Sequence, residues 1–244
     1  MKALVAQVRI ELTLMMRRGE SLLINLLIPV GFLLFFSTTK VLPSTAKHPI
    51  DFLAPAILIL AVISTSMVSL GIATGFERSY GVLKRFQATP LGVFRLLSAK
   101  IITTLTIELL QLIILIPIAL GLGWHPELSS WQGFGDVAVV LILGTIVFTG
   151  IGLLMAGTLK AEINLAACNG LYFVFLLLGG IMIPVQKLPD AIQPFSKLLP
   201  SYQLVQLLVT VLTKSRIAWE TQWIVLILWA IIIPIVAVRT WSWE

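Results

Sequence analysis

Residues 52–75 read FLAPAILILAVISTSMVSLGIATG and contain no charged side chain. At about 1.5 Å per residue, an α-helix of this length crosses the roughly 30 Å of hydrocarbon in a bilayer. The whole chain has a matching composition, because 58% of its 244 residues are hydrophobic and only 11% are charged. An ordinary soluble domain carries about 25% charged residues. The sequence therefore predicts an integral membrane protein.

Five further apolar segments are long enough to cross a bilayer. The six expected membrane-spanning helices occupy residues 21–39, 52–75, 101–123, 137–159, 163–185 and 221–238. No repeat and no low-complexity tract divides the sequence. We therefore expect residues 1–244 to form a single all-α membrane domain.

The distribution of Lys and Arg predicts the orientation of these helices. If the N-terminus is cytoplasmic, the inner segments hold 11 of the 17 basic residues and the outer segments hold six. Cytoplasmic segments of membrane proteins carry the excess of positive charge. We expect a multi-pass protein of the inner (cytoplasmic) membrane with both termini in the cytoplasm.

The formal net charge of +6 does not indicate nucleic-acid binding. The basic residues flank the apolar segments and form neither a basic stripe nor an RNA-type aromatic motif. The single cysteine, Cys168, lies inside an apolar segment and excludes an intrachain disulfide. The N-terminus is too polar for a signal peptide, so we expect the first apolar segment to direct insertion.

Two segments outside the spans have a pattern of their own. Residues 1–20 place Leu4, Val8 and Leu12 at helical spacing, which predicts an amphipathic helix on the inner membrane surface. Residues 186–216 contain prolines that break them into pieces too short to cross. We expect short re-entrant outer helices there.

Residues 76–100 form the longest inner segment. Val82, Leu83 and Phe86 alternate with basic residues and predict a short amphipathic helix. Thr89-Pro90 predicts an N-cap followed by the first residue of the helix that enters span three. Such a loop is longer than topology alone requires, which favours docking to a cytoplasmic partner over simple anchoring.

The sequence has no motif for covalent chemistry or nucleotide binding. GxxxxGK[ST], HExxH and GxSxG are all missing, and both histidines fall in expected outer loops. We therefore expect no enzyme activity and no cofactor in this chain. If the protein uses ATP, another chain binds it.

Four polar side chains inside the expected spans are candidate functional residues: Glu108, Gln111, Asn164 and Asn169. Glu108 either lines the conduit or couples two states, or it is a buried side chain bonded to Gln111 or a nearby hydroxyl. The two asparagines, with Cys168, either contact substrate or join helices, and helix packing is the more common role.

Two motifs resemble those of the type-2 ABC transporter permeases, the membrane subunits of bacterial exporters. The segment FERSYGVLKRFQATPLGVFRLLSAK after span two is similar to that family's E-R-x-x-G-x-L-[KR]-x-x-x-[AV]-[ST]-P segment. The segment GGIMIPVQKLPDAIQPFSKLLPSYQLVQLL after span five is similar to its G-x-x-[FI]-P-x-x-x-[LM]-P segment. Six spans and an amphipathic N-terminal helix also match.

This resemblance implies a transport subunit that works as a pair and is driven by separate ABC ATPase subunits. It implies that a coupling helix docks on the ATPase through residues of the first motif: Glu77, Arg78, Gly81, Leu83, Lys84 and Arg85. The N-terminal helix would lie beside it. Substrate would pass between the two permeases, along spans one, two and five.

The nearly uncharged spans favour a hydrophobic or amphiphilic cargo, such as a drug, an antibiotic, a lipid or a lipid-linked glycan. Two other functions stay open at this stage. One is a proton-coupled secondary transporter that uses Glu108 as its relay, although the sequence shows no inverted repeat. The other is a non-transporting membrane scaffold.

Overall fold

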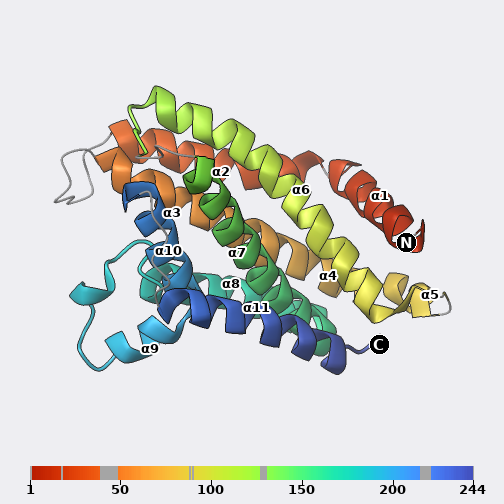
Figure 1. Ribbon diagram of the computed structural model, residues 1–244. Coiled ribbons are helices and arrows are strands. Elements are labelled where there is room, and N and C mark those ends of the chain that lie inside the picture. Colours follow the sequence, from red (N-terminus) through yellow and green to blue (C-terminus); the bar gives the residue numbers. More distant parts are fainter. Residues whose placement is uncertain are drawn as a thin grey trace.

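The structure is a computed structural model that describes residues 2–17, 19–38, 49–87, 89, 91–126, 131–214 and 221–243 (Figure 1). Every regular element in these ranges is a helix, as the sequence predicts. Several expected features lie outside the described residues: Arg18, Pro90, residues 39–48 with Lys40 and Lys47, and residues 215–216.

The helices follow the apolar segments of the sequence. In chain order they are α1 (Lys2–Arg17), α2 (Gly19–Thr38), α3 (Pro49–Ile63), the π-helical η1 (Ser64–Ser69), α4 (Leu70–Ser79), α5 (Val82–Gln87), α6 (Gly92–Gly121), α7 (Trp131–Thr158), α8 (Ala161–Leu178), the 3₁₀-helical η2 (Val185–Lys187), α9 (Gln193–Leu198), α10 (Pro200–Lys214) and α11 (Thr221–Thr240).

Within the described ranges, five helical stretches are long and apolar enough to cross a membrane. They are Leu53–Ser79, Gly92–Gly121, Gly133–Thr158, Ala161–Leu178 and Thr221–Thr240. These match the expected spans two to six. In α2, which corresponds to the expected first span, the apolar stretch that can be assessed is the shorter Leu23–Phe35. The sixth crossing stays a prediction.

The expected fifth span, residues 163–185, is wrong at its outer end. Helix α8 ends at Leu178, and Gly179 and Gly180 follow it. Gly180 has a φ of 77°, which side-chain-bearing residues rarely adopt. A Cβ at Gly179 would collide with the Ser201 hydroxyl and the Phe175 carbonyl. The two glycines therefore end the helix and turn the chain toward η2.

Helix α7 lies at the centre of the bundle and packs against α4, α6, α10 and α11. Its closest approach is to the column formed by α3, η1 and α4. A Cβ placed on Gly152 would lie 2.7 Å from the Met67 carbonyl oxygen, and one on Gly71 would lie 3.0 Å from the Gly152 Cα. The glycines therefore allow backbone-to-backbone contact, as in other membrane helix pairs.

The two ends of the bundle differ in their elements (Figure 1). The first and last described residues and α5 lie at one end, and α9 and α10 lie at the other. Helix α6 begins at Gly92, two residues after the expected start. The Thr89 hydroxyl still accepts a hydrogen bond from the Leu91 amide at 3.4 Å. This end carries the segment that resembles the coupling helix.

Candidate functional site

The motif FERSYGVLKR spans the end of α4, a turn and the short helix α5. Gly81 has a φ of 72° and donates its amide to the Arg78 carbonyl at 2.9 Å, which makes the turn. Glycine adopts this conformation without the steric cost that a Cβ brings. The turn places the six motif residues of the predicted docking site on different sides of the segment.

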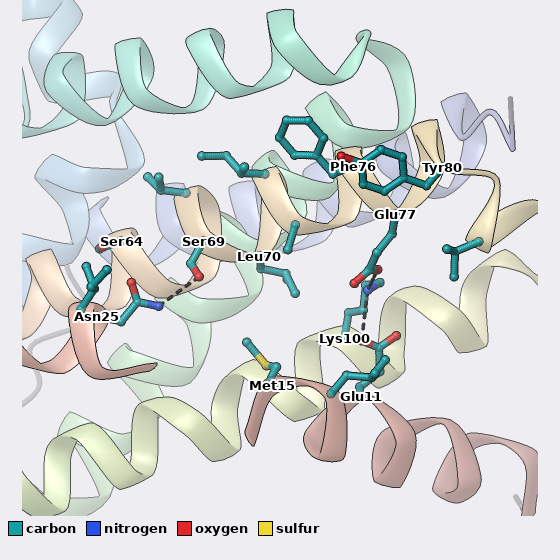
Figure 2. A pocket seen from close by; sticks show the side chains of 16 residues that line it. Glu11, Met15, Asn25, Ser64, Ser69, Leu70, Phe76, Glu77, Tyr80 and Lys100 are labelled. Carbon is teal, nitrogen blue, oxygen red and sulfur yellow. Dashed lines mark hydrogen bonds and ion pairs between the residues drawn. The ribbon is translucent and has the colours of Figure 1, made fainter. Parts of the chain in front are cut away.

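Glu77 points inward, to a buried lysine at the start of span three. Lys100 on α6 is 1% exposed, and its Nζ donates to Glu77 Oε2 at 2.8 Å and to Glu11 Oε2 on α1 at 3.1 Å. Gln7 Nε2 donates to the other oxygen of Glu11 at 2.9 Å. We call Lys100, Glu11 and Glu77 the ion-pair node; Figure 2 shows its three side chains meeting from separate helices.

The ion-pair node joins α1, α4 and α6. Removing one member of a buried ion pair leaves an uncompensated charge in a low-dielectric site, which is strongly destabilising. The helix α1 accordingly buries Gln7 and Glu11, whereas the apolar positions Leu4, Val8 and Leu12 are half-buried. Its contact with α6 is therefore polar at its centre.

Arg78 also points inward, to the end of α7. Its Nη1 donates to the Gly157 carbonyl at 2.6 Å, and its Nη2 donates to the Leu159 carbonyl. The last carbonyls of a helix have no partners within that helix and carry partial negative charge. The forked guanidinium satisfies two carbonyl groups there and fixes α4 to α7.

The remaining motif residues divide between core and surface. Leu83 is buried in a small cluster with Leu91 and Leu96. Lys84 and Arg85 on α5 are exposed. The exposed apolar side chains of Tyr80 and Phe94, at 77% and 70%, lie near them in the sequence. This end of the bundle therefore presents basic and aromatic groups together.

Glu108 lies between α6 and α7. It is buried, and the Thr145 hydroxyl contacts its Oε2, while its Oε1 has no hydrogen-bond partner among the described residues. Glu108 is not bonded to Gln111 or Thr104, the partners weighed from the sequence. Gln111 instead exchanges hydrogen bonds with Thr65 at 3.0 and 3.1 Å and donates to the Asn25 carbonyl at 3.1 Å.

The two asparagines of α8 have different environments. Asn164 is fully buried and donates from Nδ2 to the Gly71 carbonyl on α4 at 2.9 Å. Asn169 is exposed and donates to Leu165 of its own helix at 2.8 Å. Asn164 therefore joins two helices, whereas Asn169 is on an open face of α8.

A cavity of about 540 Å³ lies between α1, α2, the η1–α4 column and α6. One end has the ion-pair node, and the other has Asn25 and two serines of the π-helical turn, Ser64 and Ser69 (Figure 2). Asn25 Nδ2 donates to Ser69 Oγ at 3.0 Å. Apolar side chains, among them Met15 and Leu70, line the space between the ends.

Sequence reasoning missed the residues that connect the helices: Glu11, Asn25, Thr65, Lys100 and Thr145. Lys100 was a signal, because a lysine directly before an apolar span needs either water or a carboxylate partner. Within the described ranges, no group of three His, Cys, Asp or Glu side chains gathers as metal ligands would.

Comparison with known proteins identifies the class of protein. The model of the family described as ABC-2 type transporter matches residues 2–213. The chain is also 27% identical over 208 residues to "Putative transport permease YvfS" of Bacillus subtilis (strain 168), covering 83% of this chain and 82% of that protein.

These matches agree with the two motifs, the long apolar helices and the helical fold. The protein is a multi-pass membrane component of an ABC transporter, and its family works with an ATPase partner. The chain therefore belongs to the ABC-2 type transporter family.

Proposed function

We propose that the chain is the translocating subunit of an ATP-driven exporter, that two copies form the path, and that residues 76–100 dock on separate ATPase subunits. The observation that carries this proposal is the division within the motif. Glu77, Arg78 and Leu83 hold the segment to α1, α6 and α7, whereas Lys84 and Arg85 are exposed.

A docking segment needs both properties. It must present groups to its partner, and it must be fixed to the helices that it moves. Exposed basic and aromatic side chains suit a partner surface, because aromatic residues and arginine are enriched at protein interfaces. The buried contacts of Arg78 and of the ion-pair node connect the same segment to three helices.

The proposed mechanism is alternating access. ATP binding closes the ATPase subunits, and their differential affinity for two states of the permease supplies the free energy. Displacement of α5 then reaches α7 through Arg78, and reaches α1 and α6 through Lys100. These helices change the interface between the two copies as packed units.

An exposed face of α8 supports the pairing of two copies. Ile163, Ala166, Gly170, Phe173 and Leu177 recur at alternating spacings of three and four residues and are exposed. A Cβ at Gly170 would meet nothing within 4 Å, so a second helix has room to approach. We place this face, together with Asn169, at the interface of the homodimer.

The proposed placement in the membrane follows the charge distribution and the two ends of the bundle. We place α5 and both termini on the cytoplasmic side of the cytoplasmic membrane, with α2 as the sixth crossing. The exposed Phe195 and Leu198 of α9 favour a re-entrant position in the outer leaflet. Exposed apolar surface on most helices suits a hydrophobic or amphiphilic cargo.

Co-purification with the cognate ATPase subunit tests the docking proposal. The double variant Lys84→Glu/Arg85→Glu should lose both ATPase binding and stimulated hydrolysis, because it reverses the charge of exposed groups. The matched control is Lys187→Glu/Lys197→Glu, two exposed lysines on the proposed outer side. Unchanged binding by the first variant would contradict the docking role. Leu83 stays native, because its replacement would disturb a buried cluster.

A further inference from the structure

The cavity between α1, α2, η1–α4 and α6 has a size and a lining that suit a ligand. Binding sites for drug-sized molecules enclose about 300–1,000 Å³ and are lined mostly by apolar groups with a few polar ones. The volume of about 540 Å³ falls inside this range. None of the motif-based expectations assigned a role to this space.

The charged end of the cavity offers no free counter-charge. All three charged residues that line it are members of the ion-pair node, and Lys100 is bonded to both carboxylates. A ligand with a formal charge would have to leave water and disrupt these pairs. Desolvation of an unpaired charge costs far more than that of a neutral polar group.

The opposite end has unused capacity for neutral hydrogen bonds. Among the described residues, no group bonds to the half-buried Ser64 hydroxyl. Ser69 Oγ accepts from Asn25 Nδ2, which leaves the serine proton and the Asn25 side-chain carbonyl available. A hydroxyl or amide group of a ligand would find both donors and acceptors there.

The cavity opens beside exposed apolar side chains. Leu14 of α1 and Ile24 of α2 line it and are 41% and 49% exposed. In a membrane protein, such a rim faces lipid chains or another helix. Both residues lie near the N-terminal ends of the first two helices, at the level of the proposed inner leaflet.

We propose that this cavity is the loading site of the exporter and that its cargo is an uncharged, drug-sized amphiphile with a hydroxyl or amide group, taken from the inner leaflet. This inference rests on the proposed export function, because it names the class of molecule that is exported. The apolar body lies against Met15 and Leu70, and the polar group binds at Ser64, Ser69 and Asn25.

Photolabelling of the reconstituted permease–ATPase complex tests the assignment. The probe is a dodecanoyl monoglyceride with a diazirine in its chain, and adducts are mapped by peptide mass spectrometry. Adducts should concentrate on α1, α2 and residues 64–76. Unlabelled monolaurin should compete at least about tenfold better than lauric acid or dodecyltrimethylammonium of the same chain length.

Two variants test the cavity itself. Ser64→Ala removes one neutral hydrogen bond and should weaken labelling about two- to tenfold. Ala73→Phe fills the cavity and should abolish labelling. The matched controls are Ser79→Ala on the same helix and Ala138→Phe on α7, both at exposed positions.

The outcomes separate this inference from the proposed function. Labelling that is uniform over the exposed helices, insensitive to both variants, or stronger with the charged amphiphiles would overturn the loading site. ATPase co-purification is measured on the same samples. A permease that labels as expected but binds no ATPase keeps the cavity assignment and contradicts the proposed coupling.

Discussion

Lys100 and Glu11 are 89 residues apart in the sequence, yet Lys100 Nζ donates to Glu11 Oε2 at 3.1 Å. This contact joins the N-terminal helix to the start of span three, and the same ammonium group joins both to Glu77. The helix that precedes the first apolar segment is thus part of the inner end of the bundle.

Lys100→Met should lower the free energy of unfolding by about 3–5 kcal/mol, because it leaves two buried carboxylates without their cation. Thermal unfolding in detergent measures this change. Lys187→Met, at an exposed position, is the control and should be nearly neutral. Equal stability of the two variants would show that the ion-pair node contributes nothing.

Gly152→Ala should destabilise the protein by about 1–3 kcal/mol, because the added Cβ meets the Met67 backbone, which cannot turn away as a side chain can. Gly135→Ala on the same helix should have the opposite sign. That glycine is exposed with nothing within 4 Å, and alanine is about 1 kcal/mol better than glycine in a helix. A stabilising Gly152→Ala would contradict the close approach of α7 to η1.

Asn164→Ala should cost about 0.6–1.7 kcal/mol through the lost hydrogen bond between α8 and α4. Asn169→Ala removes only a bond within its own helix and should leave the stability of the single chain unchanged. Unfolding under conditions that separate the copies compares them. Any effect of Asn169→Ala should appear instead in the dimer fraction seen by cross-linking.

Glu108→Gln should leave transport and stimulated ATP hydrolysis within about twofold of wild type, because an amide retains the shape and can donate a hydrogen bond. The Thr145 hydroxyl has one proton and donates it to the Leu141 carbonyl at 2.9 Å. A protonated Glu108, or the glutamine amide, supplies the hydrogen in the second contact. Loss of transport with intact ATPase docking would favour the proton-relay alternative.

The sequence predicted the helices well because hydrocarbon permits few structures. Backbone groups in lipid must be paired within their own segment, so long apolar stretches become helices. The ends were less certain. Helix α8 stops at Leu178 because of a glycine turn inside an apolar run, and α6 extends back through Lys100 to Gly92 because a carboxylate pair permits that lysine to be buried.

The candidate site was predictable only as a segment. Hydropathy identified residues 76–100 as unusual, but the direction of each side chain depends on partners distant in the sequence. Glu77 faces Lys100, 23 positions away, and Arg78 faces carbonyls of Gly157 and Leu159. Periodicity on one element carries no information about such partners, so Glu77 and Lys84 looked equivalent.

The π-helical turn Ser64–Ser69 bears on how the chain tolerates insertions and deletions. A π-turn holds one more residue than the same stretch of α-helix requires. Loss of a single residue here would regularise the column and rotate everything below it by about 100°, the angle per residue of an α-helix with 3.6 residues per turn. Arg78 would then leave the end of α7, although no contact of its own had been altered. The length of this stretch, as much as its composition, is therefore under structural constraint.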